Sequence, residues 1–217
     1  MKKLRSKPFV CTGLRDDPDN LRRVKDFVID REEQYRDMDT IIGLEAYLRH
    51  AAWDDDYNRQ TKVYVIRDER HPEMIAAYFS LKAGMVAYRD AESFISEAER
   101  EHLRRQNIKS IPEALPAIEL AHFAVNDSYR RVIRREGAPV KGLGAFFYPQ
   151  FIYPIILEAA DMIGVRLVYL YAAGDEALVA YYRSVFRFHT LEYDLDLAPI
   201  KPDYDQGCTF MYRSLHS

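Results

Sequence analysis

The sequence predicts a mixed α/β protein with a central sheet flanked by helices. Two runs rich in β-branched and aromatic residues, 62–67 and 74–81, indicate an antiparallel hairpin. Farther along, a strand, a glycine-containing loop, a helix and a second strand follow one another, an order that places at least one parallel pair in the sheet. A length of 217 residues suits a single domain over 1–217, with a helical insertion near 89–113.

The composition excludes a disordered chain and does not indicate wholesale binding of nucleic acid. Apolar residues make up 48% and charged residues 30%, enough for a full core and a solvated surface. The formal net charge is −3, so attraction to a polyanion would have to come from a local basic patch. The two cysteines, Cys11 and Cys208, cannot form a disulfide framework, and no metal-ligand spacing occurs.

No targeting or membrane segment is expected. The first eight residues are basic but lack the apolar run of a signal peptide. The most apolar stretch, 146–157, contains Pro149 and Pro154 and falls short of the roughly 20 residues of a membrane-spanning helix. We therefore expect a soluble cytoplasmic protein with no membrane partner.

The elements of the N-terminal half are short. We expect a strand at 9–12, a helix near 21–29 and an amphipathic helix over 43–53. The last helix should stop near Asp54, because acidic residues at a helix C-terminus oppose the helix dipole. After the hairpin, the charged segment 89–110 is expected to form a surface helix or flap.

Stronger patterns mark the C-terminal half. A strand is expected at 117–125, followed by a basic loop at 129–141. The next helix begins at Gly142–Gly144, kinks at Pro154 and ends at Gly164.

Four further elements complete the chain. A second buried strand is expected at 165–172, and Asp175 should then cap a helix. Short strands follow at 189–193 and 208–213.

The segment Lys141-Gly142-Leu143-Gly144-Ala145 has the pattern of a phosphate-binding turn. Glycines let the backbone approach a ligand closely, and the N–H groups of a helix's first turn point outward with the positive end of the dipole. The dinucleotide fingerprint fails because Phe147 stands where a third glycine or alanine belongs, and no P-loop sequence follows. A purely structural glycine turn is the alternative. Neighbouring arginines make this region locally cationic: Arg130, Arg131, Arg134 and Arg135.

The run from Glu119 to Phe188 resembles the GNAT superfamily of acetyl-CoA-dependent N-acetyltransferases. The resemblance rests on four pieces in the family's order: a strand ending Phe123-Ala124-Val125-Asn126, the Lys141–Gly144 loop that opens a long helix, the strand 166–171 and a tyrosine helix within 175–188. Upstream, 76–81 is similar to the family's third strand. The resemblance implies a GNAT-like sheet in which an antiparallel hairpin stands beside a splayed parallel pair.

The same resemblance implies a site for acetyl-CoA as co-substrate. The pantetheine arm would pair with the strand residues Phe123, Ala124 and Val125. The pyrophosphate would rest on the backbone N–H groups of five residues: Lys141, Gly142, Leu143, Gly144 and Ala145. The thioester would lie where the parallel strands splay.

Two side chains are implied to move protons. Acetyl transfer to an amine needs a base for the attacking nitrogen and an acid for the departing thiolate. Tyr182 matches the family's acid tyrosine, with Tyr181 as the alternative because one extra residue follows it in the motif. Glu119 is the implied base. His122, on the opposite face of the strand, or water alone are the alternatives.

The acceptor is implied only as a primary amine, on a small molecule, a protein or an aminoacyl-tRNA. The helix at 43–53 followed by a hairpin resembles the GNAT toxins that acetylate aminoacyl-tRNA. The cluster at 130–141 is the main basic face that the sequence offers, so tRNA is not favoured. A homodimer is left open. Pro139 and Arg187 depart from the family's pattern, which keeps a non-catalytic acyl-CoA-binding or partner-binding module as the alternative function.

Overall fold

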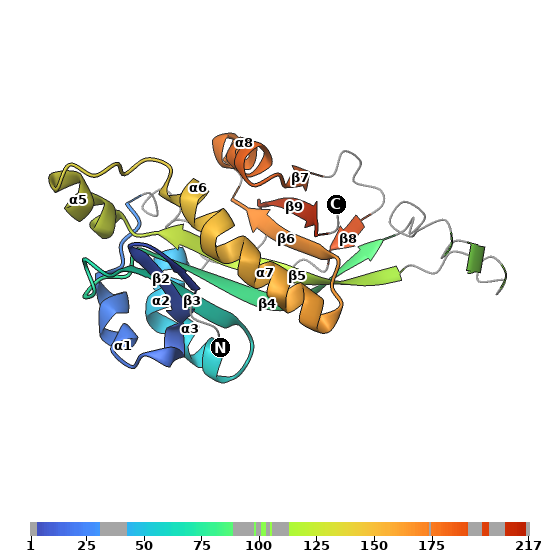
Figure 1. The fold of residues 1–217 in the computed structure, drawn as a ribbon. Helices are drawn as coiled ribbons and strands as arrows, with labels where there is room; N and C mark the ends of the chain where they lie inside the picture. The colour runs from blue at the N-terminus through green and yellow to red at the C-terminus, as the bar shows by residue number, and fades with distance from the viewer. Residues whose placement is uncertain are drawn as a thin grey trace. The chain divides into compact units, whose positions relative to one another are not determined.

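The protein consists of two compact units, each built from separate stretches of chain. The computed structural model describes residues 4–30, 43–88, 98, 101–102, 105, 113–173, 175–190, 197–199 and 207–215. The first unit comprises residues 1–82 and 119–162, and the second comprises residues 83–118 and 163–217. Strands β4 (Ala77–Tyr88) and β5 (Glu113–Val125) contribute to both (Figure 1). Most of the predicted surface helix at 89–110 lies outside the described residues.

The sheet of the first unit confirms the predicted hairpin. Its strands follow the order β1–β2–β3–β4–β5, with β1 at Leu4–Ser6, β2 at Phe9–Gly13 and β3 at Lys62–Asp68. The pairs from β1 to β4 are antiparallel, and Val65 of β3 lies opposite Tyr78 of β4. Strand β4 begins three residues later than the predicted 74–81 and extends to Tyr88.

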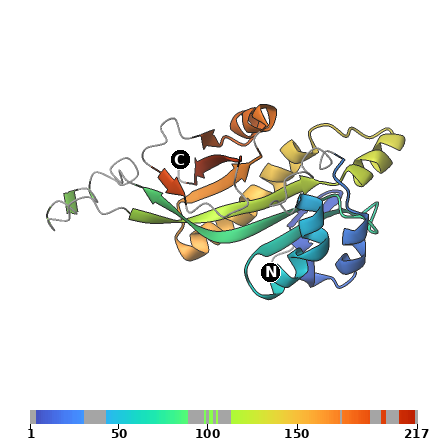
Figure 2. The ribbon, with the colours of Figure 1, turned by 180° about the vertical axis from the view of Figure 1, so that it is seen from behind.

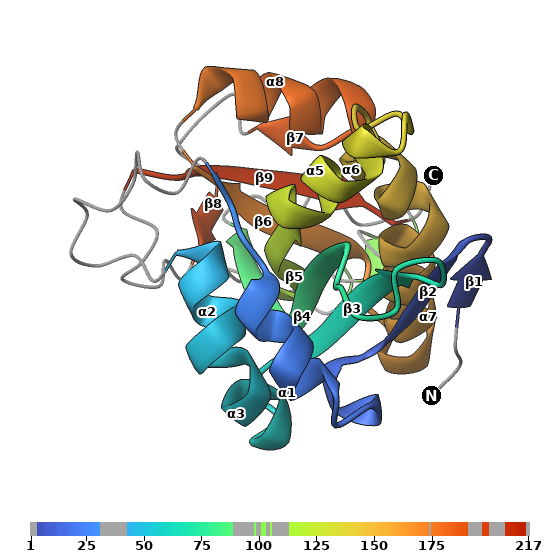
Figure 3. The same cartoon turned by 90° about the vertical axis from the view of Figure 1, so that its left-hand side faces the viewer.

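Three short helices cover one face of this sheet (Figure 2; Figure 3). They are α1 (Asn20–Arg23), which continues into a 3₁₀ turn at Val24–Asp26, α2 (Leu44–His50) and α3 (Ala52–Tyr57). Their apolar side chains meet those of the strands in a core cluster: Leu14, Val24, Phe27, Tyr47, Leu48, Ala52, Val63, Val65, Ile75, Tyr78 and Ala124.

The prediction that the helix at 43–53 stops near Asp54 is wrong. The first helix ends at Ala51 instead, and Asp54 and Asp55 lie in the first turn of a second helix, α3. Acidic residues are favourable there, because the N-terminus carries the positive end of the dipole. Asp56 is buried and accepts hydrogen bonds from the Val63 N–H (2.9 Å) and the Lys62 ammonium (3.0 Å), which fastens α3 to β3.

A long helical run packs its apolar stripe into the first unit. It comprises α6 (Leu143–Phe147), a π-helical turn (Tyr148–Ile152) and α7 (Tyr153–Ile163). The predicted kink takes the form of this π turn between Pro149 and Pro154, which lack the N–H that a regular helix uses. By length and hydropathy the run could cross a membrane. However, one apolar stripe of the run is buried, as in a core helix, whereas Met162 and Ile163 at its end are exposed. The buried residues are Phe147, Tyr148, Phe151, Ile152 and Ile156.

The second unit is built around β6 (Leu167–Ala172). It pairs antiparallel with β9 (Thr209–Ser214) over six residues, and β9 pairs with β7 (His189–Thr190). Strand β5 is the neighbour of β6 in the sheet order, and helices connect the two strands, as parallel neighbours require. A further strand, β8 (Leu197–Pro199), pairs with β4 and was not predicted. The fold class is therefore the predicted mixed α/β sheet with flanking helices.

Asp68, at the end of β3, is a fully buried carboxylate that ties the sheet to a helix of the first unit. It accepts hydrogen bonds from the Arg70 guanidinium (2.7 Å) and the Tyr129 hydroxyl (2.7 Å), and Tyr129 lies on α5 (Asp127–Arg135). Burial acts to raise the pKa of Asp68, but the hydrogen bonds from Arg70 and Tyr129 outweigh it and hold the pKa below its usual range. The charge therefore stabilises the fold at neutral pH.

We expect Asp68→Ala to lower the free energy of unfolding by about 2–3 kcal/mol, because it leaves the buried Tyr129 hydroxyl without an acceptor. Urea unfolding at pH 7 measures this. The difference from the wild type should shrink as the pH falls below about 4, where Asp68 of the unfolded chain takes up a proton.

The neighbouring carboxylate provides the control. The Glu69 carboxylate forms an exposed ion pair with Arg5 at 3.8 Å, so Glu69→Ala should cost less than about 0.5 kcal/mol. Equal losses in the two variants would contradict a structural role for the buried charge.

Candidate functional site

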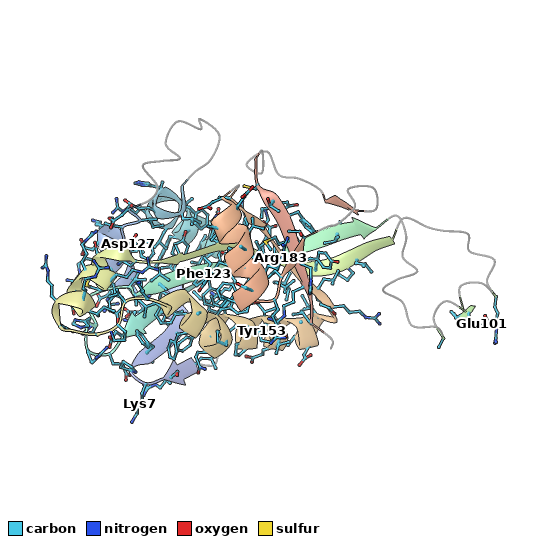
Figure 4. The ribbon with its side chains drawn as sticks, turned by 90° about the horizontal axis from the view of Figure 1, so that it is seen from above. Lys7, Glu101, Phe123, Asp127, Tyr153 and Arg183 are labelled. Carbon is cyan, nitrogen blue, oxygen red and sulfur yellow. The ribbon has the colours of Figure 1, made fainter. Side chains whose placement is uncertain are left out.

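Strand β5 ends with the residues that the resemblance assigns to the pantetheine arm. Phe123, Ala124 and Val125 are its last three residues (Figure 4). Ala124 is buried in the core cluster, whereas Phe123 and Val125 are partly exposed and belong to the opposite face by strand alternation. An extended backbone of this kind can pair with an amide-bearing chain as a further strand would.

Asn126 fixes the point where β5 ends. Its side-chain oxygen accepts from the backbone N–H groups of Val28 (3.1 Å) and Ser128 (2.9 Å). Its amide nitrogen donates to the Ile75 carbonyl (2.8 Å), and its own backbone N–H donates to the Ala76 carbonyl (2.9 Å). Sequence reasoning placed Asn126 only at the strand end, although an Asn-Asp-Ser sequence is also a helix-capping signal.

The predicted basic loop at 129–141 is wrong over most of its length, because Asp127–Arg135 forms helix α5 with Asn126 as its N-cap. Two of its arginines are neutralised. Arg130 pairs with Asp127 at 2.8 Å, and Arg131 pairs with Asp30 at 2.7 Å. Three cations remain exposed without an ion pair to any carboxylate that the structure describes: Arg134, Arg135 and Lys141.

Gly142 opens the long helical run in the conformation that a ligand-binding turn needs. Its φ of 77° is left-handed, and a Cβ added there would meet nothing within 4 Å. Its carbonyl accepts from the Phe146 N–H (2.9 Å), while Leu143 is buried and anchors the turn. The N–H groups of the first helical turn have no acceptor within the helix. With Lys141 next to it in the chain, this end of α6 can hold an anion.

Glu119 and His122 lie on β5 in different environments. Glu119 is buried, with 4% of its surface exposed. The His122 ring stacks on Tyr47 with centroids 3.6 Å apart, and its Nδ1 lies 2.7 Å from the Ser80 hydroxyl. Burial, aided by the positive charge of Lys82, lowers the pKa of His122 to about 3. A histidine with so low a pKa is a weak proton acceptor at neutral pH, which argues against it as the base.

Tyr181 and Tyr182 lie on α8 (Glu176–Val185) in the second unit. The helix begins as predicted, with the Asp175 side chain accepting from the Ala177 N–H at 2.8 Å. The Tyr182 ring packs against Phe186, with centroids 5.3 Å apart. Burial, and to a lesser degree Tyr181, raises the pKa of Tyr182. Its hydroxyl therefore keeps its proton at neutral pH.

The departure at Arg187 has a structural explanation. Arg187 has a φ of 60°, the left-handed conformation that glycine adopts without strain. The turn lets the Phe188 N–H donate to the Tyr182 carbonyl at 3.2 Å and closes the end of α8. Arg187 therefore holds a backbone conformation that glycine adopts more readily.

Most of the predicted residues belong to the first unit, namely Glu119, Phe123–Val125 and Lys141–Ala145, whereas Tyr182 belongs to the second. Within the described ranges, no group of three or more His, Cys, Asp or Glu side chains is arranged to hold a metal ion. Backbone N–H groups and exposed cations of the first unit are groups of the kind that can bind an anion.

Comparison with solved structures defines the class. No protein-family model matches the chain. The AtaT toxin bound to acetyl-CoA and to the C-terminus of its antitoxin AtaR superposes with a TM-score of 0.60 at 13% identity, covering 96% of this chain and 94% of that one. A tyrosine-to-phenylalanine mutant of KacT also gives 0.60, at 12% identity over 96% and 95%. The fold is therefore that of the GNAT acetyltransferases, as the resemblance implied.

Within that class the similar proteins are toxins. A tRNA-acetylating toxin of Mycobacterium tuberculosis (strain ATCC 25618 / H37Rv) is 26% identical over 161 residues, which cover 74% of this chain and 76% of the relative. AtaT complexed with acetyl-methionyl-tRNAfMet superposes with a TM-score of 0.57 at 17% identity, over 88% and 94% of the chains. The expectation that tRNA is not favoured is therefore corrected, because two of the similar proteins act on or bind tRNA. The AtaT structure also contains part of an antitoxin, a class of partner that the sequence analysis did not name.

We expect Gly142→Ala to weaken acetyl-CoA binding, because an alanine at φ 77° is strained by about 1–2 kcal/mol and relaxes the turn away from the ligand. The measurement is the rise in melting temperature on adding acetyl-CoA.

Gly137 offers a matched control. Its φ is 79°, and its surroundings are equally open, but it follows α5 and does not begin the long helix. Gly137→Ala should lose similar intrinsic stability and keep the full acetyl-CoA response. A normal response in Gly142→Ala would contradict the assignment of this turn.

Proposed function

We propose that this chain is an acetyl-CoA-dependent N-acetyltransferase whose acceptor is the amino group of an aminoacyl-tRNA. The observation that carries the proposal is the left-handed Gly142, open on its side-chain face, at the start of a long helix in a GNAT fold. Such a turn accommodates a diphosphate without moving a side chain. The relatives that support it bind acetyl-CoA or acetylate tRNA.

The residues of the first unit would bind and orient acetyl-CoA. The backbone at Phe123–Val125 would pair with the pantetheine amides, and the N–H groups of Lys141–Ala145 would hold the pyrophosphate. The exposed Arg134 and Arg135 lie on the same unit and add positive charge to it. Acetyl-CoA supplies an activated acetyl thioester.

The transfer joins the acceptor nitrogen to the acetyl carbon and breaks the carbon–sulfur bond. The nitrogen must lose a proton, which we assign to Glu119, directly or through water. The sulfur leaves as a thiolate and takes a proton, which we assign to Tyr182. The raised pKa of Tyr182 keeps that proton available at neutral pH. Tyr181 remains the alternative acid.

We propose tRNA as the acceptor although the whole chain is acidic. A polyanion responds to the local field, and ion pairs within α5 do not neutralise Arg134, Arg135 or Lys141. An antitoxin-like protein is the proposed macromolecular partner, by similarity to AtaT with AtaR. We further propose a cytoplasmic location, where charged tRNA is found, and a single catalytic domain over 1–217 that carries an insertion near 89–113.

Tyr182→Phe tests the chemistry. It should lower kcat for acetyl transfer to aminoacyl-tRNA by about 10²–10⁴-fold, because it removes the proton that the thiolate needs. The rise in melting temperature with acetyl-CoA should be unchanged. CoA release with charged tRNA as acceptor measures the first quantity.

Tyr181→Phe is the matched control, because it removes the adjacent hydroxyl on the same helix. It should retain most of the activity. A reversed result would move the acid role to Tyr181. Acetyl-CoA binding by the wild type without turnover of charged tRNA, free amines or peptides would favour the non-catalytic module.

A further inference from the structure

A hollow of about 490 Å³ lies in the first unit, beside α1. Its lining comes from the start of α1 and the residues just before it, the 3₁₀ turn that follows α1, and α2. Three lining side chains are cationic, namely Arg22, Lys25 and Arg49, and one, Asp19, is acidic. The function proposed above does not use this surface.

Two of these four charges are already committed. Arg49 pairs with Glu45 at 2.7 Å and donates a second hydrogen bond to the Phe27 carbonyl at 2.7 Å, which fixes its guanidinium in place. The Asp19 carboxylate lies 3.6 Å from the guanidinium of Arg23, so its charge is partly balanced from its own helix. The lining therefore carries an excess of positive charge.

Arg22 and Lys25 supply that excess. Both are exposed, and neither forms an ion pair with a carboxylate in the described part of the chain. Three residues apart in one helical run, they project from the same face. The buried Val24 between them packs in the core cluster and holds this face in position.

We propose that this hollow binds backbone phosphates of an RNA through Arg22 and Lys25, with Arg49 as a fixed third cation. The proposal rests on the proposed tRNA acceptor, for which it names a second contact surface besides the acetyl-CoA site. An RNA strand carries one charge per nucleotide and can engage several cations at once. An extended peptide is disfavoured, because the lining comes from helical segments and offers no strand edge.

The test uses the full-length protein and deacylated tRNA, which binds without reacting. Fluorescence anisotropy across a salt series gives the affinity and its salt dependence. The double variant R22E/K25E should bind at least about tenfold more weakly at 0.1 M salt. The slope of log K against log salt, which is negative, should become shallower by about two, one for each lost phosphate contact. R22Q/K25Q should show the same change with a smaller loss of affinity.

Lys7→Glu is the matched control, because Lys7 is an exposed cation of the same unit that does not line the hollow. It should leave the salt slope unchanged, and all variants should keep the acetyl-CoA melting shift.

Wild-type binding of tRNA with an unaltered slope in R22E/K25E would overturn this inference and leave the proposed function standing. Failure of the wild type to bind or acetylate tRNA would overturn both. A poly-glutamate peptide serves as a second probe. If R22E/K25E loses affinity for this peptide but not for tRNA, the hollow binds an acidic protein segment and the RNA proposal is wrong.

Discussion

The buried side chain of Asn126 is the constraint on which the first unit depends. One amide ends β5, caps α5 and holds the backbone near Val28 and Ile75. Moving any one of these segments away would leave a donor or acceptor at this buried junction without its partner, so Asn126 favours keeping the four segments together. This junction therefore holds the strand end at Phe123–Val125 in place.

The local distribution of charge in this molecule differs from what its net charge suggests. The net charge of −3 averages over acids that are already paired, such as Asp127 with Arg130 and Asp30 with Arg131. These pairs are partly exposed and add little stability. They neutralise Arg130 and Arg131. Other arginines, including Arg134 and Arg22, have no ion pair with a described carboxylate. The surface that an anion meets is thus more positive than the composition suggests.

The strong periodic patterns predicted the fold well, and the weak ones did not. The hairpin β3–β4, the long helical run and the Asp175 cap follow from local signals, because burial or capping demands those residue types there. Helix α5 was missed because its charged sequence looks like a loop, and its cap depends on Asn126, which also serves distant segments. The turn at Gly142 could be predicted because glycine favours a positive φ. The positive φ of Arg187 could not, because arginine rarely adopts it.

The two faces of β5 have different surroundings, and the proposed catalytic residue lies on only one of them. Alternation places His122 and Ala124 on one face and Glu119, Phe123 and Val125 on the other. On the first face, Ala124 belongs to the core cluster, and His122 is stacked on Tyr47 of α2 and held neutral. A histidine in that setting stabilises packing and cannot easily take a proton from an amine. In the proposed mechanism, proton transfer on β5 is assigned to the opposite face, which carries the proposed base Glu119 and, at the strand end, Phe123.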